Sequence, residues 1–107
     1  MQINKEEYKQ EKASRENRLD EFNECVKKKI SELSRNIISE LVEEREKQGL
    51  SQKELADMIG ILPYNLARFE TGVRIPTLIM LEKYASAVDK HIDIQIEENN
   101  ESLCLKE

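Results

Sequence analysis

The sequence predicts an all-α fold: a small helical bundle with one short β-strand added near its C-terminal end. Of the 107 residues, 36% are charged and 5% aromatic, so the core must consist of small aliphatic side chains, which favours packed helices over a sandwich or barrel. Apolar residues recur at spacings of three and four along most of the chain, as in amphipathic helices. Only residues 91–97 alternate apolar and polar side chains, the pattern of a strand with one apolar face.

Residues 1–35 are predicted to form an N-terminal helical arm that is partly disordered. Residues 1–16 are polar and almost without apolar periodicity, which favours a frayed helix or a disordered segment. An apolar stripe at helical spacing follows and comprises Leu19, Phe22, Val26, Ile30, Leu33 and Ile37. This helix could run unbroken into the next one, since neither Gly nor Pro intervenes before Gly49, but we expect a break or bend near Ser34, which could cap a new helix. The stripe packs either on the protein's own core or against a second protein.

The stretch from Ser51 to Gly72 predicts two short helices joined by a tight turn. Ser51 is a good N-cap, and Glu54 three residues later completes a capping box. Gly60 ends the first helix, because glycine adopts a positive φ without steric cost. Pro63 suits the first turn of the second helix, where its missing N–H is not needed. The inward-facing side chains of this pair are expected to be Leu55, Ile59, Leu66 and Phe69.

Two flanking helices complete a predicted domain over residues 36–90. Residues 37–48 form the first helix, and Thr77 caps a last helix that begins at Leu78. The expected core positions of these helices are Ile37 or Ile38, Leu41, Val42, Leu78, Leu81, Ala85 and Val88, with Tyr84 at the edge. Ile79 and Met80 fall off this stripe and form either the shoulder of a wide core face or an exposed apolar patch.

Residues 36–90 resemble the phage-repressor and Cro type of helix-turn-helix domain, the XRE-like family. Besides residues 51–72, the resemblance rests on Leu41, Arg45, Gly49 and Leu50 before them and on the run from Glu70 to Pro76. It implies a bundle that presents its second short helix to the major groove of double-stranded DNA. It also implies an ion pair between Arg45 and Glu70.

The resemblance further implies which side chains contact DNA. Base contacts fall to Pro63, Tyr64, Asn65 and Arg68, since Arg can address guanine and Asn adenine. Gln52 matches a position that contacts phosphate or base, and the remaining candidates for phosphate contact are Ser51, Lys53 and Arg74.

The chain departs from the family pattern at Leu62 and Pro63, where a capping Ser or Thr and a polar residue are usual. Three explanations stay open. Leu62 contacts a thymine methyl group, or the helix contacts few bases and depends on DNA shape, or DNA contact is not the main work of this protein.

Residues 91–97 are predicted to form a dimerisation strand through Ile92, Ile94 and Ile96, followed by a flexible tail over residues 98–107. A single strand cannot satisfy its own backbone hydrogen bonds, and the same strand of a second copy would pair with it in an antiparallel ribbon. The alternative is a tail that lies on the protein's own helices.

The net charge of −5 argues against strong non-specific DNA binding. Residues 36–97 carry seven Lys or Arg against eleven Asp or Glu. A domain this acidic must gather its few cations on one face, and dimerisation would add affinity.

These patterns predict a sequence-specific, double-stranded-DNA-binding transcriptional regulator, a repressor that works as a homodimer. The chain is also similar to HigA-type antitoxins, which bind a toxin and repress their own operon. Under that interpretation the arm would hold the toxin through Leu19, Phe22, Val26 and Ile30. The alternative function is a protein-interaction module that neutralises or scaffolds a partner protein without binding DNA.

Catalysis is not expected, because the sequence has no glycine-rich phosphate loop, no HExxH and no useful Cys/His/Asp grouping. Neither a metal nor another cofactor is expected, and His91 has no second candidate ligand beside it. We expect Cys25 and Cys104 to be free thiols in a reducing cytoplasm. The sequence has no signal peptide or membrane-spanning run, so a cytoplasmic protein without a membrane partner is predicted.

Overall fold

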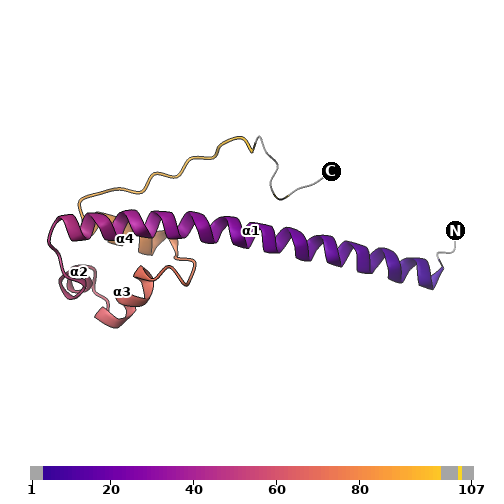
Figure 1. Cartoon of the computed structure of the whole chain (residues 1–107), viewed down its shortest axis with the longest axis horizontal. Coiled ribbons are helices and arrows are strands. Elements are labelled where there is room, and N and C mark those ends of the chain that lie inside the picture. Colours follow the sequence, from indigo (N-terminus) through magenta and orange to yellow (C-terminus); the bar gives the residue numbers. More distant parts are fainter. Residues whose placement is uncertain (1–3, 100–103, 105–107) are drawn as a thin grey trace. The chain divides into compact units, whose positions relative to one another are not determined.

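The computed structural model describes residues 4–99 and residue 104. The described chain forms four helices: α1 (Lys5–Lys47), α2 (Gln52–Ile59), α3 (Pro63–Glu70) and α4 (Leu78–Ala87) (Figure 1). They confirm the predicted all-α class. By its contacts the chain divides into two units: the N-terminal part of α1 with the C-terminal end of the chain, and residues Ile30–Glu97. The predicted boundaries near residues 35 and 90 stay a prediction.

Helix α1 runs without interruption from Lys5 to Lys47, so the break predicted near Ser34 is wrong. Ser34 is buried inside the helix, and neither Gly nor Pro occurs before Gly49 to divert the backbone. The helix begins where the Asn4 side chain accepts a hydrogen bond from the backbone N–H of Glu6 at 3.0 Å.

In the first unit, Cys25 and Cys104 are joined by a disulfide bond, which corrects the expectation of free thiols. Their Cα atoms lie 5.5 Å apart, inside the range that a disulfide bridges. The two residues are 79 positions apart in sequence, and a spacing of this length carries no local signal of pairing. Disulfides persist mainly in oxidising surroundings. The cysteines therefore no longer support the prediction of a reducing compartment.

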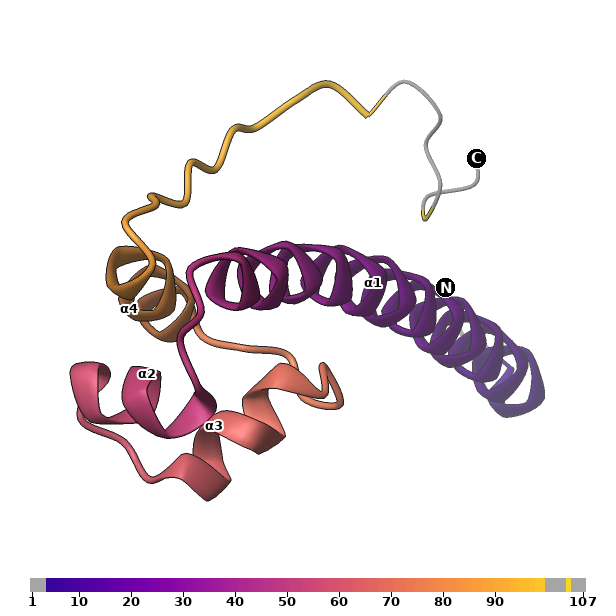
Figure 2. The ribbon, with the colours of Figure 1, turned by 60° about the vertical axis from the view of Figure 1, so that its left-hand side comes forward.

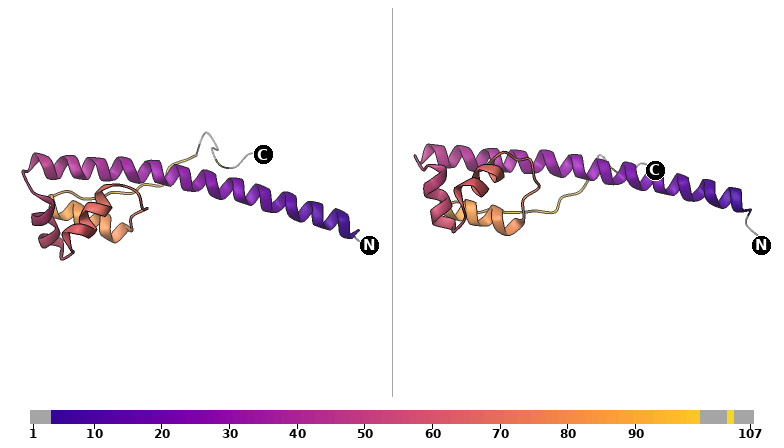
Figure 3. Two further views of the ribbon diagram at one scale, coloured as in Figure 1. Left: turned by 60° about the horizontal axis from the view of Figure 1, so that its bottom comes forward. Right: turned by 90° about the horizontal axis from the view of Figure 1, so that it is seen from below.

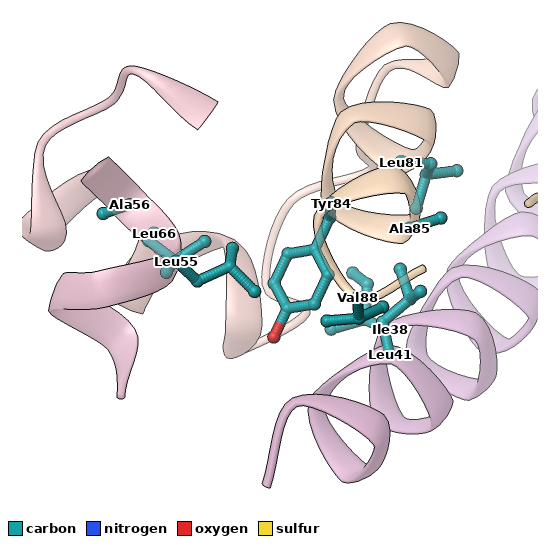
Figure 4. Close-up of a cluster of buried hydrophobic side chains, with 9 residues drawn as sticks. All are labelled: Ile38, Leu41, Leu55, Ala56, Leu66, Leu81, Tyr84, Ala85 and Val88. Atoms are coloured by element: carbon teal, nitrogen blue, oxygen red, sulfur yellow. The ribbon is translucent and has the colours of Figure 1, made fainter. Parts of the chain in front are cut away.

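The second unit is built around nine buried apolar side chains from all four helices. Figures 2 and 3 show α2, α3 and α4 gathered on one side of the last turns of α1. The ring of Tyr84 extends from α4 between the α2–α3 pair and α1 (Figure 4). The core comprises Ile38, Leu41, Leu55, Ala56, Leu66, Leu81, Tyr84, Ala85 and Val88.

Most predicted core positions are therefore confirmed, with two differences on α4. Tyr84 is fully buried instead of lying at the edge, whereas Leu78 is 65% exposed. Met80 packs partly against the core, while Ile79 is 66% exposed. Residues 81, 84, 85 and 88 share one face at helical spacing, and this face is turned slightly from the predicted one.

The turns around α2 and α4 follow the predicted capping chemistry. The backbone N–H of Glu54 donates to Ser51 Oγ at 3.0 Å, and the Glu54 carboxylate accepts from the Ser51 N–H at 3.3 Å. Gly60 ends α2 with φ +76°. Thr77 Oγ1 accepts a hydrogen bond from the Met80 N–H at 3.2 Å and so caps α4. The position of α2, and through it the start of α3, is therefore set by local sequence.

The C-terminal segment is extended, and the described residues do not support the strand predicted over residues 91–97. The described residues contain no strand, and Figure 2 shows the segment continuing from the end of α4 without regular structure. Ile92 packs partly on the core and its N–H donates to Glu82 Oε2 at 3.0 Å, whereas Ile94 is 59% exposed and Ile96 fully exposed. A strand needs a second strand, and residues 4–99 do not supply one.

The junction before this segment is held by an ion pair. His91 Nδ1 lies 2.7 Å from Glu82 Oε1. The hydrogen bond and charge of Glu82 raise the pKa of His91, and the hydrogen bond from His91 lowers the pKa of Glu82.

No helix among the described residues has the length and apolar character needed to cross a bilayer.

Candidate functional site

All eight side chains predicted to contact DNA lie on the surface of the second unit. They come from the start of α2, from α3 and from the loop that follows α3: Ser51, Gln52, Lys53, Pro63, Tyr64, Asn65, Arg68 and Arg74. Their exposure follows from the helical period. Leu55 of α2 and Leu66 of α3 are buried in the core, so the other side of each helix faces solvent.

Helix α3 presents a polar and aromatic outer face at a fixed orientation. Leu66 is fully buried, which anchors the helix, while Tyr64 is 69% exposed. Arg68 lies four residues after Tyr64, one helical turn away, and its guanidinium carbon is 5.8 Å from the centroid of the Tyr64 ring. This cation–π contact restrains the long arginine side chain on the exposed face.

Three of the predicted contact residues border one open hollow. Asn65, Arg68 and Arg74 line a depression of about 530 Å³ between α3 and the loop that leads to α4. Phe69 and Val73 add apolar surface to it. The structure thus brings together residues nine positions apart in sequence, a proximity that the sequence pattern did not predict.

The cations of this face have no acidic partner among the residues that the structure describes. Within residues 4–99, no carboxylate forms an ion pair with Lys53, Arg68 or Arg74, although the chain has an excess of acidic residues. Unpaired, exposed cations on one face are what an acidic domain needs in order to bind an anionic polymer.

A comparison with models of protein families identifies this arrangement. The model described as helix-turn-helix matches residues 41–95, more than half of the chain. The chain belongs to this helix-turn-helix family. The XRE-like resemblance is thereby confirmed, and the family is one of DNA-binding transcriptional regulators. A search of curated proteins and a search of solved structures each gave no match.

A buried ion pair fixes the helix-turn-helix unit to the end of α1. Arg45 Nε lies 2.8 Å from Glu70 Oε2, and Arg45 Nη2 donates to Glu70 Oε1 at 3.1 Å. The two side chains are only 10% and 7% exposed. Arg45 Nη1 also donates to the backbone carbonyl of Leu50 at 2.7 Å, so one guanidinium joins α1 to the turn between α1 and α2 and to the end of α3.

Two further side chains donate hydrogen bonds to the Glu70 carboxylate, and the sequence did not predict either contact. The Tyr84 hydroxyl donates to Glu70 Oε2 at 2.6 Å, and Gln52 Nε2 donates to Glu70 Oε1 at 2.8 Å. The hydroxyl of Tyr84 also accepts from Arg45 Nε at 3.2 Å. The helical spacing of Tyr84 from Leu81 and Val88 was the signal that could have indicated its burial, but nothing local indicates the partner of Gln52.

The network keeps both charges of the ion pair in place. Burial by itself would raise the pKa of Glu70, but hydrogen bonds from Tyr84, Arg45 and Gln52 hold it below its usual value. Burial opposes the charge of Arg45, and the bonds to Glu70 and Tyr84 outweigh it, so the pKa of Arg45 is raised. Burial and the neighbouring Glu70 carboxylate raise the pKa of Tyr84. These groups stay in one protonation state at neutral pH, as a structural element of a helix-turn-helix domain requires.

Proposed function

We propose that this protein is a repressor that binds specific sequences of double-stranded DNA as a homodimer. One observation carries the proposal: α3 buries Leu66 while it turns Tyr64, Asn65 and an unneutralised Arg68 towards solvent. Side chains of these types can reach base edges in the major groove when a helix of this motif lies there.

The roles of the contact residues follow from their donors and acceptors. Arg68 can donate two parallel hydrogen bonds to guanine, and Asn65 can address adenine, each with about 1–3 kcal/mol of discrimination. Lys53 and Arg74 supply charge for phosphates. Gln52 uses one amide N–H for Glu70 and keeps a second N–H that can donate to a phosphate.

Selection from a random duplex library at near-physiological salt tests the proposal. We expect enriched sequences with two related half-sites, because a two-fold dimer contacts DNA twice. Affinity for the enriched duplexes should then exceed affinity for a scrambled duplex at every salt concentration. Binding with a steep salt dependence and no sequence preference would contradict the proposal.

The homodimer is proposed to form through the extended C-terminal segment. Ile94 and Ile96 alternate with polar residues and expose apolar side chains, and the backbone of residues 93–97 has no hydrogen-bond partner within the described chain. A second copy would pair with this backbone and cover both isoleucines. Ile92 would add less to this interface, since its side chain already packs partly on the core of its own chain.

Replacing Ile94 by aspartate should raise the dimer dissociation constant at least about tenfold, because the dimer would have to bury an unpaired charge. Sedimentation equilibrium measures the change. Gln95→Asp is the matched control, since it adds the same charge at the neighbouring position that faces the other way. Equal dissociation constants for the two variants would show that these isoleucines are not at the interface.

An antitoxin role is a second candidate, favoured by the exposed stripe on α1. Leu19, Val26 and Ile30 are 57%, 42% and 38% exposed, so the helix offers an apolar face that the described part of the chain leaves open. Such a face suits a small partner protein, and a DNA-bound antitoxin would repress its own operon. Co-expression with the neighbouring reading frames tests this role: Leu19→Asp should abolish co-purification of a toxin, and failure of the wild-type chain to retain any neighbour would refute it.

A further inference from the structure

The beginning of α3 exposes two large apolar side chains directly beside the polar contact residues. Leu62 is 67% exposed and Tyr64 is 69% exposed, with Pro63 between them in the first turn of the helix. Neither side chain is needed for the core, which Leu66 fills from the opposite side of the same helix. The outer face therefore combines apolar and cationic groups within about one turn.

Leu62 occupies this position at a cost to the fold. It is the N-cap of α3 and makes no side-chain cap hydrogen bond, whereas the N-caps of α2 and α4, Ser51 and Thr77, both do. Its backbone, with φ −72° and ψ 142°, closely matches that of Thr77, so a capping hydroxyl residue would fit without strain. A residue that forgoes a cap and exposes an apolar side chain satisfies no folding requirement, which points to a binding role.

In the major groove, one base carries an apolar group on its edge: the 5-methyl group of thymine. We infer that Leu62 and the ring of Tyr64 recognise thymine methyl groups, beside the guanine that Arg68 contacts. The inference rests on the proposed DNA binding and adds the chemical class of the site, thymine next to guanine in each half-site. The contact between Arg68 and Tyr64 holds the ring and the guanidinium at a fixed separation, so thymine and guanine should occur at a fixed spacing.

The test uses duplexes enriched by this protein from a random library, resynthesised with deoxyuridine in place of thymine at one position at a time. Deoxyuridine pairs like thymine and lacks only the methyl group. Removing a methyl that packs against Leu62 or Tyr64 should weaken binding roughly fivefold, in line with the burial of one carbon. Substitution at other thymines should leave the affinity unchanged.

Leu62→Ser separates contact from folding. Serine restores a good N-cap, so the variant should be at least as stable as the wild type. It should bind the thymine duplex more weakly, and the penalty for deoxyuridine at one position per half-site should disappear. Tyr64→Ala should remove the penalty at a different position and leave the position of Leu62 sensitive.

The outcomes distinguish the two proposals. Failure to enrich any sequence would overturn the proposed function and this inference together. Enriched duplexes that bind equally well with deoxyuridine at every position would overturn the inference alone. A deoxyuridine penalty that persists in full in both variants would overturn it as well, because the methyl groups would then act through DNA shape.

Discussion

The Arg45→Ala variant is expected to lose roughly 3–5 kcal/mol of free energy of unfolding, the usual effect of removing one partner from a buried ion pair. The guanidinium is the common partner of the Glu70 carboxylate and of the Leu50 carbonyl. Without it, a carboxylate that is 7% exposed keeps its charge with only Tyr84 and Gln52 as donors. Alanine favours the helix, so the loss cannot be attributed to weaker helix formation in α1. Urea unfolding followed by circular dichroism measures it.

Lys47→Ala is the matched control, because it removes a cation from the same end of α1. The Lys47 side chain is 65% exposed and its ammonium lies 3.8 Å from the Glu43 carboxylate, so the variant should change stability by less than about 0.5 kcal/mol. Equal effects of the two substitutions would contradict the structural role of Arg45.

Acid should weaken the same network. The pKa of Glu70 lies below its usual 4.5 in the folded protein, so the unfolded chain takes up this proton first as the pH falls. The contribution of Glu70 to the free energy of unfolding is therefore fully present above about pH 4.5. It is lost as the pH drops through the pKa that Glu70 has in the folded protein. A Glu70→Gln variant should be less stable at neutral pH and should lack this part of the acid dependence.

The Arg68→Ala variant should lose about 5- to 150-fold in affinity for enriched duplexes, the equivalent of about 1–3 kcal/mol for one bidentate base contact. Arg68 is exposed and forms no ion pair with the described residues, so its removal should leave the free energy of unfolding within about 0.5 kcal/mol. Affinity for a scrambled duplex should fall much less. Fluorescence anisotropy at fixed salt measures both affinities.

Two substitutions decide why Arg68 matters. Arg68→Lys keeps the positive charge but loses the planar fork, so it should retain non-specific binding and lose specificity. Lys83→Ala removes a cation from α4, beside the hollow that Met58 and Ser86 border, and should leave specificity unchanged.

If Arg68→Ala keeps the full sequence preference, α3 does not contact bases as proposed. If the protein binds no DNA but still retains a partner protein, its function is better explained as a protein-interaction module that does not bind DNA.

Local chemistry made much of the helix-turn-helix unit predictable. The Ser51–Glu54 capping box, the positive φ of Gly60 and the cap at Thr77 depend on neighbours within four residues, and all three are present as expected. The exposure of Tyr64 and Arg68 follows from the burial of Leu66 on the same helix. Short-range rules were sufficient at these positions.

The errors occurred where long-range contacts decide. For Tyr84, helical spacing is consistent with burial, but only the tertiary structure shows the Glu70 carboxylate that accepts a hydrogen bond from its hydroxyl. Ser34 was expected to start a new helix, yet it is buried inside α1. The disulfide joins Cys25 to a residue 79 positions away, which no spacing rule predicts.

By itself the sequence determined the family, the helix limits from Gln52 to Glu70 and the identity of the exposed side chains on α3, since each depends on periodicity and on caps within a few residues. Only the tertiary structure decided how Glu70 is coordinated, that Asn65, Arg68 and Arg74 share one hollow, and that residues 91–97 stay unpaired in one chain. These features depend on which distant groups meet when the core closes, and a strand also needs a partner strand, which the described part of this chain does not contain.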